Sequence, residues 1–546
     1  MKTLLIGINT KYIHPAMALY QIKYNCMYDC EIMEFTIKDS DDTIISKITD
    51  RLNSSQYGLI GFSCYLWNIK KILNISSFIK RLFPLKIALG GPEVSYDAKY
   101  FLENYSFIDF IMRGEGEDSF NELIEYIKGK RQIENVCNIS YLKDGLYTEN
   151  PLKMCDLSKI KLATLMVKDL KNQVVYLESS RGCPFHCAYC TASLDNRVRF
   201  FPLDDVLSIL KYLMDNKATT VKFLDRTFNA NKKYMMNILS FINNNNICTT
   251  FQFEIVVDML DDEVINFISR LDKKYLRFEV GIQTTNDEVN KNVFRKQNMI
   301  KLKENIKKLN ETNNIDIHVD LIAGLPGESL DSFINSFNET FLLRCKELQL
   351  GFLKFLRGTK LLDSVDKFEC KYSSEPPYEI ISNSTLSEED LSEIKLVEKS
   401  LNYYYNSGRF NRTFAYLLDH NYIDNPYDFF KSLSYNLFTK DLYGLFIHIN
   451  SYFKAHFRGI YEVLKYNLII DYLNNSKTKP KRWWNEKLTK ETRKILYPII
   501  VDKIPTLTLS DLYEYSVIIN YLNNYYIIIY KNFKPVTYEI KIDSND

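Results

Sequence analysis

Three cysteines close together in the chain are the residues with the clearest capacity for chemistry. Cys183, Cys187 and Cys190 lie in the run RGCPFHCAYC at residues 181–190, a C-x3-C-x2-C pattern. Thiolate sulfur is a soft ligand that selects zinc or iron-sulfur clusters. The spacing therefore predicts a metal centre held by three thiolates.

The number of ligands separates these two kinds of centre. A structural zinc ion needs four protein ligands. His186 lies inside the cysteine loop, which is a poor position for a fourth ligand, whereas Cys155 could arrive from the segment before the loop. A cubane cluster held by three cysteines leaves one iron open, as a substrate-binding cluster requires. The pattern favours the cluster, with zinc as the alternative.

Bulk composition argues against several functional classes. The chain has 546 residues, a formal net charge of +2 and 46% hydrophobic residues. Its interspersed charges provide no global attraction for nucleic acid or an anionic membrane, and no window approaches the roughly 20 apolar residues of a membrane span. The other eight cysteines have no disulfide-type spacing, and the start of the chain reads as a core strand rather than a secretory signal. We expect a cytoplasmic protein with no nucleic-acid partner and no membrane span.

The elements that position the cysteines come in two alternating series. In the first series, strand patterns at 3–9, 31–37, 59–64, 86–91 and 107–113 alternate with helical patterns that include 41–52, 68–83 and 117–129. Alternation of this kind predicts a doubly wound parallel sheet covered on both faces, with ligands beyond the carboxyl ends of its strands. Small residues gather at three of these ends. Glycine there allows close backbone approach to a ligand, although a tight turn explains any single one. The candidate ligand-binding residues are Ser63, Gly90, Gly91, Glu115 and Gly116.

The second series begins after an irregular segment, which we interpret as a short strand and a linker. Its strand patterns lie at 174–178, 221–225, 250–257, 276–283, 315–323 and 348–355. Six such units predict a partial TIM-like (βα)6 barrel, and the cysteine loop follows its first strand, at the carboxyl edge where chemistry in such folds resides. Beyond about Pro376 helical patterns dominate. The predicted parts are a Rossmann-like domain (1–145), a linker (146–172), the barrel (173–375) and a mainly α-helical domain (376–546).

The cysteine spacing, directly after the first strand of a partial barrel, resembles the radical S-adenosylmethionine superfamily. The resemblance implies a [4Fe-4S] cluster on Cys183, Cys187 and Cys190 as the catalytic centre. In that family the open iron chelates S-adenosylmethionine, which is cleaved reductively to a 5'-deoxyadenosyl radical. An aromatic residue at the position of Tyr189 contacts the adenine region.

Other motifs fall at the ends of later barrel strands, where the same resemblance implies cofactor contacts. Glu279 and Gln283 lie in FEVGIQT (278–284), which is similar to the family's fourth-strand motif for the ribose and amino acid portion. Arg295 matches a basic residue near the cofactor carboxylate. Ile322 and Gly324 lie in DLIAGLPGE (320–328), like the family's adenine-binding turn.

The second barrel strand departs from the family's usual Gly-Gly-Glu. It ends in LDRTFN (224–229), whose Asp225 resembles the Asp-x-x-Phe variant of the cobalamin-binding branch. The doubly wound N-terminal domain resembles the cobalamin-binding domain of that branch, so cobalamin is the third implied cofactor. The Asp-x-His-x-x-Gly signature of a cobalt-ligating histidine is absent around His14. We therefore expect His14 at most to line the site.

The resemblance covers roughly residues 1–375, while the C-terminal part resembles an uncharacterised extension of some members. The resemblance implies an enzyme, and the reaction that it favours is the cobalamin-dependent transfer of a methyl group to an unactivated carbon. Cyclisation, rearrangement or sulfur insertion without methyl transfer is one alternative, and a non-catalytic metal-binding sensor or scaffold is another. An organic substrate of unknown identity, a flavodoxin or ferredoxin type electron donor and an anaerobic setting are also implied.

Overall fold

The computed structural model describes residues 2–271, 275–481, 490–503, 507–521, 524–530 and 535–541. The chain divides into two compact units. The first comprises Met1–Lys346 and Leu350–Leu391, and the second comprises Glu347–Gln349 and Ser392–Asp546. The predicted boundaries at 145 and 172 lie inside the first unit and stay predictions. In the described part of the chain, no helix is both long and apolar enough to cross a membrane.

The first unit opens with a seven-stranded sheet in the order β2-β1-β3-β4-β5-β6-β7. Strands β1 to β5 are parallel, whereas β6 and β7 form an antiparallel hairpin at one edge. Each strand predicted up to residue 113 is present, and only the second strand of the hairpin was not anticipated. The strands are β1 (Lys2–Asn9), β2 (Cys30–Thr36), β3 (Tyr57–Ser63), β4 (Lys86–Gly90), β5 (Phe110–Met112), β6 (Ile139–Lys143) and β7 (Leu146–Glu149).

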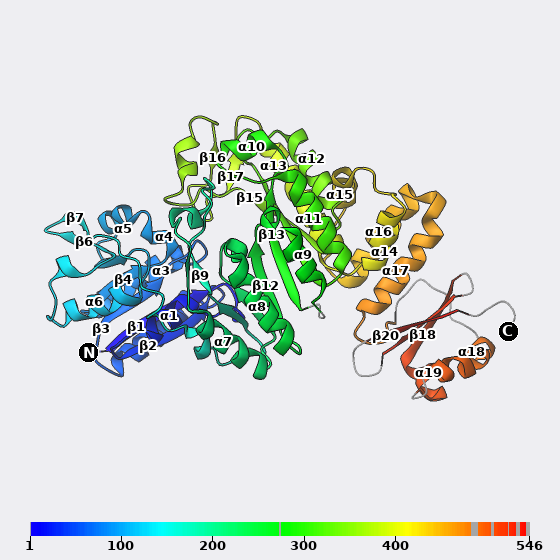
Figure 1. Ribbon diagram of the computed structural model, residues 1–546, viewed down its shortest axis with the longest axis horizontal. Helices are drawn as coiled ribbons and strands as arrows, with labels where there is room; N and C mark the ends of the chain where they lie inside the picture. The colour runs from blue at the N-terminus through cyan, green and yellow to red at the C-terminus, as the bar shows by residue number, and fades with distance from the viewer. Residues whose placement is uncertain are drawn as a thin grey trace. The chain divides into compact units, whose positions relative to one another are not determined.

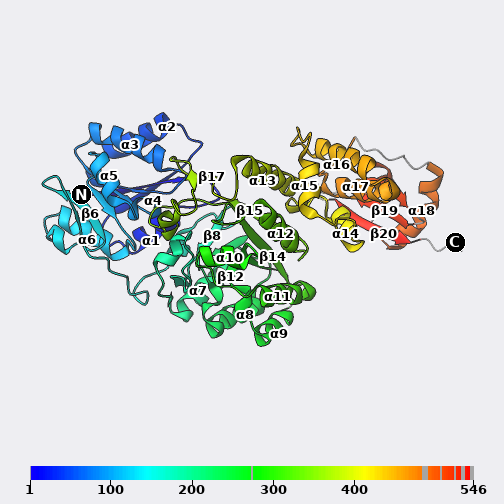
Figure 2. The ribbon, with the colours of Figure 1, turned by 90° about the horizontal axis from the view of Figure 1, so that it is seen from above.

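Helices cover both faces of this sheet, as Figure 2 shows. Apolar residues of α1 (Met17–Tyr24) and α6 (Glu117–Ile127) pack on one face. Those of α2 (Asp41–Asn53), α3 (Ile69–Leu82) and α5 (Ala98–Asn104) pack on the other, and the short α4 (Pro92–Ser95) follows β4. The sequence explains such helices locally. Ser40 caps α2 by accepting a hydrogen bond from Thr43 N, and Ile44, Ile48 and Leu52 form its buried stripe. The doubly wound fold is confirmed.

The strand order places a topological switch point between β1 and β3, where ligands of doubly wound sheets bind. A buried side chain ties the two strand ends together there. Asn68 Nδ2 donates to Ile8 O (3.1 Å) and to Ser63 O (2.9 Å). The carboxyl ends of β1 and β3 are therefore held in a fixed geometry.

The second sheet has six strands in the order β15-β14-β13-β12-β11-β8, and the described pairings are parallel. It is an open barrel, since β8 and β15 are its two edges, and the predicted partial barrel is confirmed. The strands are β8 (Val174–Leu177), β11 (Thr220–Phe223), β12 (Thr250–Ile255), β13 (Leu276–Gln283), β14 (Ile315–Ala323) and β15 (Glu347–Phe352). Helices α7 (Leu203–Asp215), α8 (Lys232–Asn245), α9 (Asp262–Ser269), α10 (Asp287–Asn292), α11 (Met299–Thr312) and α12 (Leu330–Phe341) alternate with these strands (Figure 1).

The two faces of the barrel sheet differ in chemistry. In β13 the fully buried Phe278, Val280 and Ile282 alternate with the half-buried Arg277 and Glu279. Successive side chains of a strand point to opposite faces, so the apolar set packs under the helices and the polar set lines the interior. The barrel interior is therefore a polar surface.

The second unit is mainly helical, as predicted. Its helices are the end of α13 (Glu388–Leu401), a π-helical turn (Asn402–Asn406), α14 (Asn411–Asp419), α15 (Pro426–Ser434), α16 (Leu442–His456), α17 (Tyr461–Asn475), α18 (Lys490–Lys503) and α19 (Leu509–Tyr515). An antiparallel sheet that the sequence patterns did not predict follows them, formed by β18 (Ser516–Tyr521), β19 (Asn524–Ile529) and β20 (Val536–Lys541). Apolar side chains on its two faces enter separate clusters, so continuous isoleucine-rich runs replace the alternation typical of strands.

Candidate functional site

The cysteine loop joins β8 to α7 and is closed at its base. The short strands β9 (Ser180–Arg181) and β10 (Arg199–Phe200) pair antiparallel, with Arg181 opposite Arg199. Cys183 N donates to Asp195 O (2.9 Å) inside this closure. Gly182 has φ +89°, and a Cβ there would lie 2.2 Å from Arg197 O. Only glycine fits such a position, so the residue before the first cysteine is dictated by the loop.

The three thiols gather within this loop. Cys183 and Cys187 are buried, Cys190 is partly exposed, and none of them is in a disulfide. Burial raises the pKa of Cys190, and the neighbouring Cys187 and Cys183 raise this pKa further. The Cys183 sulfur also lies 3.5 Å from Thr227 Oγ1. Three thiols within one closed loop, none of them in a disulfide, fit the donor set of a cluster with three cysteine ligands.

Arg295 connects this loop with the fourth strand of the barrel. Its Nη1 donates to Tyr189 OH (3.2 Å) and approaches Cys187 Sγ (3.8 Å), while its Nη2 donates to Gly281 O. Gln297 accepts from Arg295 Nε (2.9 Å) and fixes the guanidinium. The structure thus brings together Arg295, Tyr189 and the cysteines, which sequence reasoning had placed in one site.

Cys155, the candidate fourth ligand of the zinc alternative, has a carboxylate partner. Cys155 Sγ donates to Glu117 Oε2 at 3.8 Å, and burial raises the pKa of this thiol to about 12. Within the described residues, no three His, Cys, Asp or Glu side chains converge on a position for a single metal ion. Three cysteines suffice for a cubane, which takes each thiolate on a different iron, whereas a structural zinc ion needs a fourth protein ligand.

Gln283, at the carboxyl end of β13, has an unsatisfied group. Its Oε1 is buried and has no hydrogen-bond partner, and its backbone adopts φ +70°. Buried polar atoms are nearly always paired, so an orphaned acceptor at a strand end points to a missing donor. A hydroxyl group of a bound cofactor would satisfy it.

The predicted adenine-binding turn is fixed from two sides. Gly324 has φ +91°, and a Cβ there would lie 2.8 Å from the Ile380 side chain, while Asn383 Nδ2 donates to Gly324 O (3.1 Å). Ile322 is half-buried at the end of β14. Below the turn, Thr284 Oγ1 donates to the fully buried Glu328 (2.5 Å). Burial raises the pKa of Glu328 to about 7, although hydrogen bonds from Thr284 and Ser336 oppose the rise.

Two predicted cofactor residues already have protein partners. The carboxylate of Asp225 accepts from Ser179 N (2.9 Å), Ser179 Oγ (2.6 Å) and Ser180 Oγ (2.5 Å), at the root of the cysteine loop. Burial still raises the pKa of Asp225 to about 6. Glu279, four residues before Gln283 in β13, accepts from Lys222 Nζ (2.9 Å) and from the Gln252 amide. Cofactor binding by Asp225 and Glu279 stays a prediction.

The loop after β1 contacts the first barrel strand. His14 Nδ1 and Tyr176 OH are 2.7 Å apart, and Val174 N donates to Ile13 O (2.9 Å). Burial lowers the pKa of His14, and the charges of Lys11 and Lys222 lower it further. His14 thus links the loop after β1 to the first barrel strand.

Packing explains some, but not all, of the other predicted residues at the carboxyl edge of the first sheet. Gly91 has φ +110°, and a Cβ there would lie 2.5 Å from Cys64 O. A Cβ on Gly116 would press on Ile22 at 3.2 Å, whereas one on Gly90 would make only ordinary contacts. Ser63 is buried, and its carbonyl accepts from Asn68. Their roles as ligand-binding residues stay predictions.

An aromatic pair at the switch point was missed from the sequence. Tyr65 and Trp67 stack with ring centroids 4.5 Å apart and an interplanar angle of 5°. Trp67 is 48% exposed, and its Nε1 donates to Ile8 O (3.2 Å). A flat, partly exposed surface here suits a planar ligand. Their position within four residues of the end of β3 was the feature of the sequence that could have indicated this surface.

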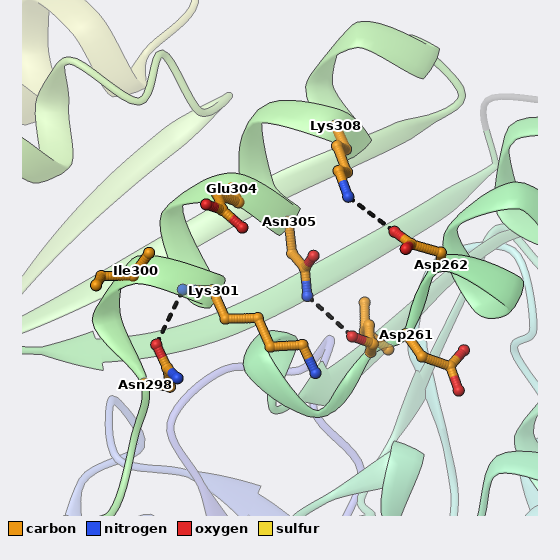
Figure 3. Close-up of a pocket in the computed structure, with 9 residues that line it drawn as sticks. Asp261, Asp262, Asn298, Ile300, Lys301, Glu304, Asn305 and Lys308 are labelled. Carbon is orange, nitrogen blue, oxygen red and sulfur yellow. Dashed lines mark hydrogen bonds and ion pairs between the residues drawn. The ribbon is translucent and has the colours of Figure 1, made fainter.

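Figure 3 shows a surface hollow between the starts of α9 and α11 that carries no comparable chemistry. Lys308 pairs with Asp262 (2.8 Å), and Asn305 Nδ2 donates to Leu260 O (3.0 Å). These contacts join two neighbouring helices. The cysteine loop and the carboxyl edge of the first sheet together are the stronger candidate.

Family models match three parts of the chain. Residues 5–124 match the B12 binding domain, and residues 177–339 match the radical SAM superfamily. Residues 366–512 match a family described as a protein of unknown function, DUF4080. The first two matches contain the carboxyl edge of the N-terminal sheet and the cysteine loop.

Curated relatives are similar over part of the chain. An uncharacterized methyltransferase of Pyrococcus horikoshii is 27% identical over 39% of this chain and 48% of its own length. The 2-(S-pantetheinyl)-carbapenam-3-carboxylate methyltransferase of Streptantibioticus cattleyicolor is 23% identical over 50% of this chain and 43% of its own length. The chain thus spans less than half the length of these two relatives.

The architecture also has a counterpart among solved structures. The cobalamin-dependent S-adenosylmethionine radical enzyme OxsB with aqua-cobalamin bound matches with a TM-score of 0.62 and 14% identity, over 93% of this chain and 81% of that one. At this identity the similarity concerns the fold. It includes the N-terminal doubly wound sheet and the partial barrel.

Proposed function

We propose that this chain, a radical SAM superfamily protein with a B12-binding domain, is an enzyme that cleaves S-adenosylmethionine reductively and transfers a methyl group to a carbon of an organic substrate. The observation that carries the proposal is the closed loop with three free thiols beside Tyr189 and Arg295. When bound, the cluster would reduce S-adenosylmethionine and cobalamin would supply the methyl group.

The chain's own residues would bind and orient these groups. Cys183, Cys187 and Cys190 would hold the cluster, and Arg295, which donates toward Cys187 Sγ, would stabilise the more negative state of a cluster bound there. Gln283 Oε1 would accept a hydrogen bond from a cofactor hydroxyl. The turn around Gly324 would offer backbone groups to the adenine.

The corrinoid would lie at the carboxyl edge of the first sheet. The switch point between β1 and β3, the stacked Tyr65 and Trp67, and the contact of His14 with Tyr176 support this position. His14 Nδ1 already has a partner and the pKa of its imidazole is lowered, so we assign it to lining the site rather than to cobalt ligation.

Methyl transfer is supported by the two curated relatives that are named as methyltransferases. A radical reaction without methyl transfer is the second candidate, because one solved structure of similar fold, which covers 93% of the chain, is titled only a cobalamin-dependent radical enzyme. Either reaction needs an organic substrate and a reductant, for which a flavodoxin or ferredoxin type protein is proposed.

The deciding experiment is anaerobic reconstitution of the full chain with iron, sulfide and hydroxocobalamin. We expect the absorption of a cluster, retained corrinoid and formation of 5'-deoxyadenosine with dithionite and S-adenosylmethionine. The triple variant Cys183→Ala, Cys187→Ala, Cys190→Ala should lose the cluster and the product but keep the corrinoid. Wild-type protein that binds no cluster, or zinc in its place, would contradict the proposal.

Methyl-labelled S-adenosylmethionine separates the two candidate reactions. Label that appears on the retained corrinoid after incubation supports methyl transfer. Formation of 5'-deoxyadenosine without labelled corrinoid supports the second candidate.

A further inference from the structure

A buried ion-pair network joins the cysteine loop to the turn after β5. Arg181, two residues before Cys183, pairs through Nη2 with Glu117 (2.5 Å) and through Nη1 with Glu115 (3.3 Å), and it also binds Glu178 (2.9 Å). Arg181 is 12% exposed, Glu115 16% and Glu117 5%. Ion pairs this far removed from water are little screened, so they hold their partners strongly.

The other end of the loop enters the same network. Arg199 Nη2 pairs with Glu115 (2.6 Å) and with Asp195 (3.1 Å), and its Nη1 donates to Cys155 O (3.2 Å). Asp195 O in turn accepts the hydrogen bond from Cys183 N. One carboxylate, that of Glu115, therefore binds both arginines that pair across the base of the loop.

The carboxylates and the arginines come from different folding elements. Glu115 lies in the turn between β5 and α6, next to the B12-binding sheet, and Glu117 is the first residue of α6, whereas Arg181 and Arg199 bracket the three cysteines. Glu115 Oε2 also accepts from Cys155 N (2.5 Å) in the connecting segment. Both oxygens of the Glu115 carboxylate therefore bind groups at the base of the cysteine loop or in the segment that leads to it.

A second buried carboxylate at the same sheet edge provides a contrast. Glu93, 3% exposed, accepts from Tyr378 OH (2.5 Å) and from Arg357 Nε (3.2 Å), which follow the last barrel strand. These partners lie outside the cysteine loop. Glu93 thus also links the sheet edge to the barrel, but through a different part of it.

We propose that Glu115 and Glu117 are positioning residues that hold the cluster-binding loop beside the corrinoid-binding edge of the first sheet. Glu115 binds Arg181 and Arg199 at the two ends of the loop, and Glu117 binds Arg181. The inference rests on the proposed function, because it requires a cluster on the loop. It assigns Glu115 to orienting the cysteines and not to contact with a cofactor.

The test compares Glu115→Gln, Arg199→Gln and the double variant with wild type and with Glu93→Gln as the matched control. The reconstituted full chains are measured by electron paramagnetic resonance of the reduced cluster with and without S-adenosylmethionine, by optical titration with hydroxocobalamin and by 5'-deoxyadenosine formation. Glu115→Gln should give a shifted or heterogeneous cluster signal and about tenfold less product, since small displacements of reacting groups slow chemistry strongly. Its affinity for hydroxocobalamin should match that of wild type.

Two further comparisons isolate the network. The double variant should be no worse than the more severe single one, because both changes remove the same interaction. Glu93→Gln should keep the wild-type cluster signal. If Glu115→Gln does not fold by circular dichroism, Arg199→Lys replaces it as the test variant. Lysine keeps the positive charge of Arg199 but loses one of its two ion pairs, with Glu115 and Asp195. This variant should shift the cluster signal to a smaller extent.

Two results would overturn the inference. One is a wild-type cluster signal in the folded Glu115→Gln or Arg199→Lys protein. The other is a tenfold loss of corrinoid affinity with an unchanged cluster signal, which would make Glu115 a corrinoid ligand. A wild-type protein without cluster or 5'-deoxyadenosine would instead contradict the proposed function itself.

Discussion

At the residue scale, the site depends on carboxylates that the fold keeps away from water. Glu328 and Asp225 are both buried, with pKa values raised to about 7 and about 6, yet they perform different local tasks. Asp225 accepts three hydrogen bonds at the root of the cysteine loop, whereas Glu328 Oε2 has no partner beneath the turn that is predicted to bind adenine. The second arrangement favours a protonated carboxyl group.

Glu328 therefore predicts a pH dependence of stability. Because its pKa rises from 4.5 to about 7 on folding, its favourable contribution is complete below pH 4.5 and is lost as the pH rises toward 7. The full shift corresponds to about 3 kcal/mol. Thermal unfolding between pH 5 and 8 should show a midpoint that falls with pH in wild type and falls less in Glu328→Gln. Equal slopes in the two proteins would refute this assignment.

At the element scale, the cysteine loop is a closed structure rather than a flexible connection. The β9–β10 pair, the Cys183 to Asp195 hydrogen bond and the left-handed Gly182 define its path. The loop can therefore present its thiols in a defined arrangement before a cluster binds, which lowers the ordering cost of binding.

Gly182→Ala tests this closure. The new Cβ would lie 2.2 Å from Arg197 O at φ +89°, so the loop must open, and we expect iron and sulfide content to fall several-fold after reconstitution. Gly129→Ala is the control, because it has φ +73° and nothing within 4 Å of the new Cβ. That change should cost only about 1–2 kcal/mol of backbone strain and leave the iron content unchanged. Equal iron loss in both variants would contradict a specific role of the loop.

At the scale of the whole molecule, the division into two compact units separates the cofactor residues from the C-terminal helices. Each residue assigned here to the cluster, S-adenosylmethionine or cobalamin lies in the first unit. The second unit has its own apolar clusters, formed by α17 to α19 and the sheet β18 to β20. The two units should therefore unfold as separate cooperative transitions.

Ligand binding should shift only one of these transitions. A ligand at one hundred times its dissociation constant stabilises the folded state by about 2.7 kcal/mol. In calorimetry of the full chain, hydroxocobalamin should raise the midpoint of the first unit and leave that of the second in place. A shift of both transitions would mean that the second unit contributes to the corrinoid site.

Much of this architecture could be predicted because parallel sheets have strong local patterns. The six barrel strands and the five parallel strands of the first sheet were predicted to within a few residues, since buried apolar runs alternate with amphipathic helices. The cysteine spacing alone predicted three cluster ligands, and the structure places these residues in one closed loop. The β18–β20 sheet was missed, because strands with both faces in apolar clusters lack the period of two that separates strands from helices.

The sequence by itself determined which residues can hold a cluster and which strand ends they follow, because both depend on spacing along the chain. Only the tertiary structure decided what each polar side chain does. Glu115 and Glu279 have the same carboxylate group. Glu115 binds Arg181 and Arg199 at the base of the cysteine loop, whereas Glu279 binds Lys222 inside the barrel. Arg199 is 84 positions from Glu115 and Lys222 is 57 positions from Glu279, and such contacts are set by the packing of whole elements.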